Sequence, residues 1–291
     1  MSVTFTVPPE FEGYKLGNLL HHQLGISSSQ IKSAKWDGRI RVNGENVYVS
    51  YCVHTGDLIQ FEDAPVIPKY AVAPMTLHLN IPYEDDDLLV IDKPAGIATS
   101  SSLKYPDDAL ENAVFSYLGC PQDFLFRPVN RLDKGTSGLM VAAKNPMTQH
   151  ALQSILHTSD FFRSYLAVTD GIPAALSGII DLPIAKAEGP TIRREVRSDG
   201  KPSVTKYEVL STHGNRALVR LILETGRTHQ IRVHLSAIGC PVFGDFLYGS
   251  ESDELKGRFA LHSEHIILRL PSGRVLDITS PLPEPLKRLL S

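Results

Sequence analysis

The sequence predicts an α+β protein in which a large domain with a mixed, largely antiparallel sheet follows a small N-terminal α/β module. Short apolar runs of strand length dominate from residue 79 onward, and segments with helical periodicity interrupt them. The 20 prolines and 21 glycines predict many turns, which argues against a helical bundle. A chain of 291 residues, 42% of them hydrophobic, has enough apolar material for two cores of unequal size.

Residues 1–63 are expected to form a compact module of two helices and a small β ribbon. Leucines recur at helical spacing from Leu16 to Leu24, and Gly25 is a favourable residue to end that helix. A serine-rich stretch follows and can cap a second helix. The expected strands cover residues 39–42, 47–53 and 58–61, with a tight turn at Asn43 and Gly44. Repeated prolines then predict a linker over residues 64–78.

Residues 79–291 are expected to form the large domain. The apolar runs 88–91 and 139–143 predict buried strands. Asn145 and Pro146 are favourable residues with which to begin a helix. The remaining expected elements are a hairpin over residues 204–223 and a helix over residues 231–238.

Composition limits the classes of function. The 29 basic and 32 acidic residues give a net charge of −3, so any nucleic-acid contact needs a local basic patch. Cys52, Cys120 and Cys240 lie far apart, which excludes a disulfide scaffold or a cysteine-based zinc site and favours a reducing compartment. The sequence shows no signal peptide and no apolar run near the ~20 residues of a membrane span. We therefore expect a soluble cytoplasmic protein without a membrane partner.

The densest group of chemically active side chains is found at residues 130–138, directly before an apolar strand. Asp, Gly, Thr and Ser in this segment are also typical of an ordinary tight turn. The spacing of glycine and lysine differs from that of a phosphate-binding P-loop. Charged side chains beside a compact turn are nevertheless typical of catalytic loops, so this segment is the first candidate for an active site.

Residues 131–139 resemble the signature loop of RluA-type pseudouridine synthases. Four further segments resemble other motifs of that family and follow in the same order. The five segments cover residues 90–96, 131–139, 163–168, 225–235 and 244–249. The resemblance extends from residue 79 to the C-terminus and implies the pseudouridine synthase fold. Asn130 and Thr99 stand where the family most often has histidine.

The resemblance also implies the roles of individual residues. It implies that Asp133 is the catalytic carboxylate, that Arg232 is its cationic partner, and that Tyr165 packs on the uracil. Such a site acts on a base that has been flipped out of folded RNA, and Arg131 would fill the vacated place in the stack. The implied substrate-binding residues are Arg131, Lys93, Arg227, Lys32 and Lys35.

The N-terminal segment resembles, less closely, an alpha-L RNA-binding module, which implies RNA contacts on the helix that carries Lys32 and Lys35. The module usually has a basic residue at the position of Ser28. The most basic stretch of the chain lies within residues 193–206, and we interpret it as a contact for RNA phosphates. His229 and His234 are interpreted as structural or RNA-facing, because their spacing is not that of a zinc site.

These motifs predict an isomerase that converts specific uridines in structured RNA to pseudouridine. The reaction needs one ionised carboxylate, and we expect neither a cofactor nor a metal. The resemblance favours ribosomal RNA as the target, with transfer RNA as the alternative, and we expect a monomer. A catalytically silent RNA-binding assembly factor is a second alternative, although it would not need Asp133, Tyr165 and Arg232 together. A glycosidase is a third, but no motif supplies its second carboxylate.

Overall fold

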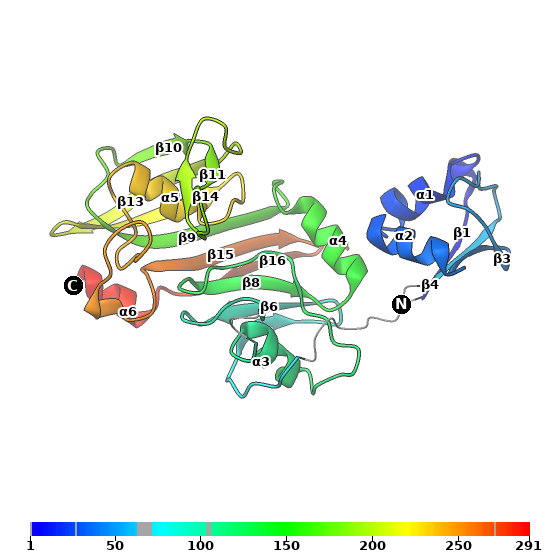
Figure 1. Ribbon diagram of the computed structural model, residues 1–291, viewed down its shortest axis with the longest axis horizontal. Helices are drawn as coiled ribbons and strands as arrows, with labels where there is room; N and C mark the ends of the chain where they lie inside the picture. The colour runs from blue at the N-terminus through cyan, green and yellow to red at the C-terminus, as the bar shows by residue number, and fades with distance from the viewer. Residues whose placement is uncertain (1, 27, 63–71, 103–105, 271) are drawn as a thin grey trace.

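The computed structural model describes residues 2–26, 28–62, 72–102, 106–270 and 272–291. Residues 2–62 form a unit with its own core, in which Leu16, Ile59 and Phe61 are buried. Its strands form an antiparallel sheet in the order β1-β4-β2-β3 (Figure 1). The elements of this unit are β1 (Ser2–Thr6), a 3₁₀ turn (Pro9–Phe11), α1 (Leu16–Asn18), a π-helical turn (Leu19–Gln23), α2 (Ser28–Trp36), β2 (Ile40–Val42), β3 (Glu45–Asn46) and β4 (Leu58–Glu62).

Two sequence predictions for this unit have opposite outcomes. The tight turn between β2 and β3 is confirmed, with Asn43 and Gly44 both at positive φ (54° and 85°). The strand predicted at residues 47–53 is wrong. The carbonyl groups of Val49 and Tyr51 instead accept hydrogen bonds of 2.8 Å from backbone N–H groups at the start of α1. Those carbonyls therefore satisfy the first turn of the helix, and β1 supplies the outer strand of the sheet instead.

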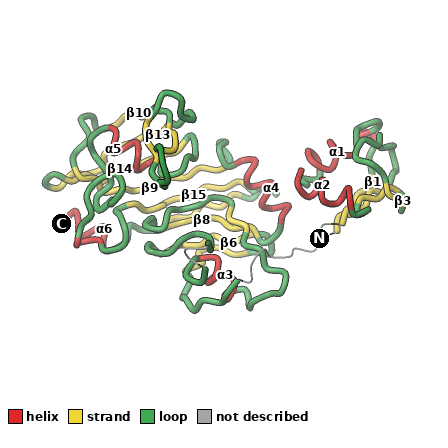
Figure 2. Tube along the Cα trace, viewed as in Figure 1, coloured by secondary structure: helices red, strands yellow, loops and turns green. Residues whose placement is uncertain are grey.

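The main body is built on a ten-stranded sheet with the path β10-β13-β14-β9-β15-β8-β6-β5. Figure 2 shows the strands crossing this body while the helices lie at its periphery. The strands of this sheet are β5 (Asn80–Glu84), β6 (Leu88–Lys93), β7 (Arg127–Pro128), β8 (Ser137–Ala143), β9 (Phe161–Asp170), β10 (Ser177–Asp181), β13 (Val204–His213), β14 (Arg216–Leu223), β15 (Leu261–Arg269) and β16 (Val275–Thr279). Because β8 and β15 form its one parallel pairing among the described residues, the predicted largely antiparallel α+β fold is confirmed.

A separate hairpin and several short helices complete the main body. They are β11 (Ile184–Lys186), β12 (Arg194–Val196), α3 (Leu110–Tyr117), α4 (Pro146–Ile155), α5 (Gln230–Ala237), α6 (Glu284–Lys287) and two 3₁₀ turns (Asp253–Leu255 and Arg288–Leu290). The predicted start of α4 is confirmed, since the Asn145 side chain accepts a 2.8 Å hydrogen bond from the Thr148 N–H. Within the described residues, every helix is too short or too polar to cross a lipid bilayer.

The predicted linker is only partly visible, because residues 63–71 lie outside the described residues. Residues 72–78 pack against the main body instead of spanning open space. The Met75 N–H donates a 2.8 Å hydrogen bond to Ser116 on α3, and the Asn112 side chain donates one of 2.8 Å to the Ala73 carbonyl. This part of the predicted linker is therefore attached to the large domain.

The parallel contact between β8 and β15 joins the two halves of the sheet. It consists of His262 opposite Ser137 and Ser263 opposite Gly138. Gly138 has a φ of +105°, and a Cβ at this position would overlap the backbone of Ser263. Only glycine fits this crossing. The candidate catalytic loop enters β8 directly at this junction, so the junction fixes where the loop lies.

Replacing Gly138 with alanine tests this requirement. We expect Gly138→Ala to lower the free energy of unfolding by about 3 kcal/mol or more, because steric overlap adds to the strain of positive φ. Gly273→Ala is the control, since its φ is +83° and nothing lies within 4 Å of the added Cβ. That control isolates the conformational term of about 1–2 kcal/mol. Equal losses in urea denaturation of the two variants would contradict the steric argument.

Candidate active site

The loop that carries Asp133 is held from below by the segment that follows β6. The Thr99 hydroxyl donates a 2.7 Å hydrogen bond to the carbonyl of Leu132. The backbone N–H of Gly96 donates one of 2.8 Å to the carbonyl of Lys134. Since these bonds fix the residues on both sides of Asp133, its backbone is positioned independently of any substrate.

Lys93 lies beneath the same loop with no exposed surface. Its ammonium group donates to the carbonyls of Pro94 (2.9 Å), Ile97 (3.0 Å) and Lys134 (3.5 Å). Burial lowers the pKa of Lys93 to about 7, although the nearby Asp133 opposes this shift. A fully buried amine cannot touch RNA in this structure, so the predicted substrate contact is replaced by a role in supporting the loop.

Arg232 joins Asp133 to a second carboxylate. One N–H of its guanidinium donates a 3.0 Å hydrogen bond to Asp133. Two others form a bidentate pair with Asp245 at 2.6 and 2.8 Å. The Arg232 side chain is 3% exposed and that of Asp245 is fully buried, whereas that of Asp133 remains 28% exposed. Burial alone would lower the pKa of Arg232, but the two carboxylates outweigh burial and raise it.

This arrangement confirms the predicted contact between Asp133 and Arg232. The resemblance named no partner for the planar fork of the guanidinium, which is the pair of N–H groups that can bind one carboxylate together. The fork engages Asp245, which sequence reasoning placed in a family motif but did not identify as a site residue. A bidentate contact fixes both the position and the plane of the guanidinium. Asp133 therefore receives one directed N–H from a cation that cannot rotate away.

Aromatic rings enclose the rest of the guanidinium. The Arg232 Cζ lies 4.1 Å from the ring centre of Phe259 and 5.0 Å from that of Tyr248. At these distances the ring faces attract the cation. The Phe259 ring also packs tightly against Gly135, where an added Cβ would lie 2.6 Å from the ring. The glycine after Lys134 thus lets the loop that carries Asp133 lie directly against the Phe259 ring, which also covers Arg232.

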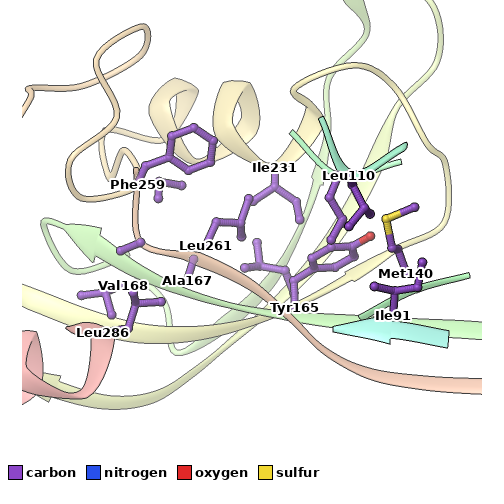
Figure 3. Packing of buried hydrophobic residues seen from close by; sticks show 14 of the residues in the cluster. Ile91, Leu110, Met140, Tyr165, Ala167, Val168, Ile231, Phe259, Leu261 and Leu286 are labelled. Atoms are coloured by element: carbon purple, nitrogen blue, oxygen red, sulfur yellow. The ribbon is translucent and has the colours of Figure 1, made fainter. Parts of the chain in front are cut away.

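Tyr165 on β9 borders the same site. Figure 3 shows its ring beside Leu110, with Ile231 of α5 above it and Met140 of β8 nearby. The residue is 5% exposed. Together with Asp133, Arg131 and Arg232, it lines a shallow hollow of about 70 Å³. The structure therefore brings the three predicted catalytic residues together.

The remaining predicted substrate-binding residues differ in location. Arg131 is exposed at the hollow, beside Asp133. Arg227 is also exposed there, and its Nε donates a 3.1 Å hydrogen bond to the Pro202 carbonyl. Lys32 and Lys35 lie exposed on α2 in the N-terminal unit and do not line the hollow.

The two histidines near α5 have separate roles. The ring of His234 is held by the Thr205 hydroxyl and the Leu182 carbonyl, each at 2.9 Å, so this residue is structural. The His229 ring lines the hollow, and its Nε2 lies 3.9 Å from a carboxylate oxygen of Asp133. Sequence reasoning left His229 between a structural and an RNA-facing role. Proximity to Asp133, which the spacing of the two histidines does not reveal, distinguishes His229 from His234.

Comparison with known proteins gives matches to one family. Residues 87–237 match the family described as RNA pseudouridylate synthase. The chain is 36% identical to the RNA pseudouridine synthase YjbO of Bacillus subtilis, over 92% of this chain and 95% of that protein.

The chain belongs to the RNA pseudouridylate synthase family.

Further relatives agree with this family membership. It is 35% identical to ribosomal large subunit pseudouridine synthase D of Xanthomonas campestris, over 90% of this chain and 84% of that one. A solved structure of human RNA pseudouridylate synthase domain containing 4 superposes with a TM-score of 0.57 and 28% identity, covering 71% of this chain and 90% of the human one. The resemblance seen in the sequence motifs is confirmed, and the protein is an RNA pseudouridine synthase, an isomerase.

Asp245 is the residue whose replacement tests the geometry of this synthase. We expect Asp245→Ala to lower the free energy of unfolding by about 3 kcal/mol or more, since it removes the main partner of a buried cation. Asp245→Asn keeps the shape and should still lose most RNA isomerase activity, because Arg232 is no longer held in its plane. The control is Asp253→Ala, whose ion pair with Lys256 is exposed and should contribute less than about 0.5 kcal/mol. Wild-type activity in Asp245→Asn would contradict the positioning role.

Proposed function

We propose that this synthase isomerises specific uridines in structured RNA, with ribosomal RNA as the target class and Asp133 as the catalytic carboxylate. The observation that carries the proposal is the position of Asp133. It is the partly exposed member of a buried carboxylate–arginine–carboxylate group and opens into the hollow bordered by Tyr165. A reactive carboxylate needs such a fixed, charged and accessible setting.

The chemistry follows from this setting. The N1–C1′ bond of the uridine breaks, the uracil turns, and C5 bonds to C1′. The C5 proton is lost and N1 gains one, so the reaction is an isomerisation with no net change in atoms. The ionised Asp133 serves either as the nucleophile at C1′ or as the base that removes a sugar proton. Tyr165 packs against the uracil while the base is detached from the sugar.

Base flipping delivers the uridine to this hollow. A base stacked inside folded RNA cannot reach a carboxylate that opens into a concave site. Arg131 is exposed and lines the same hollow as Asp133, and its planar guanidinium can stack where the base has left. Arg131 and Asp133 lie two residues apart on one loop. Insertion of the arginine into the RNA stack and binding of the uridine at Asp133 therefore occur together.

A basic cavity next to the hollow supports RNA-backbone binding. The charged residues that line this cavity of about 480 Å³ are Lys186, Arg194, Lys201, Arg227 and one carboxylate, Asp199. Arg227 lines the hollow as well. In the part of the chain that the structure describes, no carboxylate lies within 4.0 Å of these four cations. By contrast, Arg197 pairs with Asp199, and Lys206 pairs with Glu224. We therefore assign the phosphate contacts to the four unpaired cations of the cavity.

The relatives support the choice of RNA class. Several are named ribosomal large subunit pseudouridine synthase D, which favours ribosomal RNA over transfer RNA. Because Asp133, Tyr165 and Arg232 share one hollow, the geometry favours an enzyme over a silent assembly factor. The three cysteines are free, as expected of a protein that works in the reducing cytoplasm. Mapping pseudouridines in cellular RNA with and without the protein would test the target.

Asp133→Asn tests the catalytic assignment. The amide keeps the size of the side chain but has no charge, so we expect pseudouridine formation to fall roughly 10³-fold or more while RNA binding persists. Asp86→Asn is the matched control, because Asp86 is an exposed carboxylate that does not line the hollow, so this variant should retain full activity. If Asp133→Asn forms pseudouridine at a rate comparable to wild type, the catalytic role proposed for Asp133 is wrong.

We propose that the N-terminal unit, residues 1–63, tethers RNA through the exposed face of α2. Reversing both lysines, Lys32→Glu with Lys35→Glu, should weaken RNA binding roughly tenfold and reduce the salt dependence of log Kd by about 1 to 2. The turnover of bound RNA should not change. The control reverses Lys287 and Arg288, which are exposed on and after α6. If both double variants bind RNA as tightly as wild type, the proposed tethering of RNA by the N-terminal unit is wrong.

A further inference from the structure

His229 occupies a strained position at the edge of the active site. It precedes the first residue of α5 and has a φ of 60°, a conformation that residues other than glycine seldom adopt. Its side chain is 10% exposed. The Nε2 atom faces the Asp133 carboxylate at 3.9 Å, and the Nδ1 atom lies 2.8 Å from the Tyr248 hydroxyl. Both ring nitrogens are therefore directed at defined groups.

The partner of Tyr248 determines where the ring proton lies. The backbone N–H of Arg194 donates a 2.7 Å hydrogen bond to the Tyr248 oxygen, and a backbone N–H can only donate. Among the described residues, His229 Nδ1 is the one acceptor within hydrogen-bond distance of the Tyr248 hydroxyl, so the Tyr248 proton is assigned to that contact. Burial raises the pKa of Tyr248, which keeps the phenol protonated. In the neutral ring, the proton must then be on Nε2, the nitrogen that faces Asp133.

The groups around the ring keep it neutral. Burial lowers the pKa of His229, and the cations Arg232 and Arg194 add to this effect, while Asp133 and Asp245 oppose it. A neutral imidazole with a fixed tautomer presents one N–H donor. The 3.9 Å separation from Asp133 is too long for a direct hydrogen bond but leaves room for one hydroxyl oxygen to contact both groups.

We propose that His229, locked by Tyr248, donates from Nε2 to the ribose 2′-hydroxyl of the target uridine, which donates in turn to Asp133. The inference rests on the proposed function, because it requires the sugar of a flipped uridine to lie over Asp133. The 2′-hydroxyl is the sugar group that both donates and accepts, as this position between an N–H and a carboxylate requires. His229 would thus hold the sugar in place and select RNA over DNA.

Two substitutions separate the roles of the ring nitrogens. The amide nitrogen of glutamine can take the place of Nε2, whereas that of asparagine reaches only as far as Nδ1. We expect His229→Gln to keep the isomerisation rate within about threefold of wild type, and His229→Asn to lose about 10- to 100-fold in kcat/KM. Equal losses in the two folded variants would overturn the proposal, since a purely structural role for the ring does not distinguish them.

A modified substrate tests which atom of the nucleotide is contacted. The probe is an RNA that the wild-type enzyme isomerises, prepared with uridine or 2′-deoxyuridine at the target position. The loss caused by His229→Asn should be present with uridine and should shrink to within about twofold with 2′-deoxyuridine, because the contact is already missing. The same loss with both RNAs would overturn the contact. Absence of isomerisation by the wild-type enzyme on every RNA would instead refute the proposed function.

The tautomer can be measured without RNA. Nitrogen NMR of the full-length protein distinguishes a protonated Nε2 from a protonated Nδ1, and comparison with His229→Gln assigns the signals. We expect the Nε2–H form in wild type and a mixture of both forms in Tyr248→Phe. A wild-type His229 with its proton on Nδ1 would overturn the proposal, even if the enzyme is active.

Discussion

The active site depends on the burial of one guanidinium group. Arg232 is almost completely removed from water, so its charge must be matched within the protein. Asp245 matches it with a bidentate contact, and the ring of Phe259 covers one face. Because these contacts fix the guanidinium, the N–H on its Nη1 atom defines where the Asp133 carboxylate lies. Replacement of any of these neighbours should therefore displace Asp133, the carboxylate that we propose as catalytic.

The fold brings these groups together at the place where its two half-sheets meet. The loop before β8 supplies Asp133, α5 supplies Arg232, and the segment before β15 supplies Phe259. Two glycines allow this close approach. Gly138 lets β8 lie against β15, and Gly135 lets the loop lie against the Phe259 ring. The family motif around Asp133 thus specifies close packing as well as reactive groups. This explains why Gly135 and Gly138 follow the charged residues of the motif.

The sequence predicted the parts of the site that depend on local pattern. The helical period placed Arg232 on α5, and the loop motif identified Asp133. Contacts between distant segments were less predictable. The sequence alone does not show whether Asp133 or Asp245 forms the bidentate contact with Arg232. The burial of Lys93 was also not predictable, because it depends on the loop that folds over it. The prediction of a strand at residues 47–53 was wrong for a similar reason, because carbonyl groups of this segment accept hydrogen bonds from the start of α1.

The distribution of charge around the site helps to orient a nucleotide. At the centre, two carboxylates share one arginine, and the pKa of about 7 for Lys93 means that this lysine adds only part of a positive charge near neutral pH. The cations that remain accessible, Arg131 and Arg227, lie at the edge of the hollow. This arrangement supports the proposed binding mode, in which the phosphates of a nucleotide contact the rim and its uncharged sugar approaches Asp133.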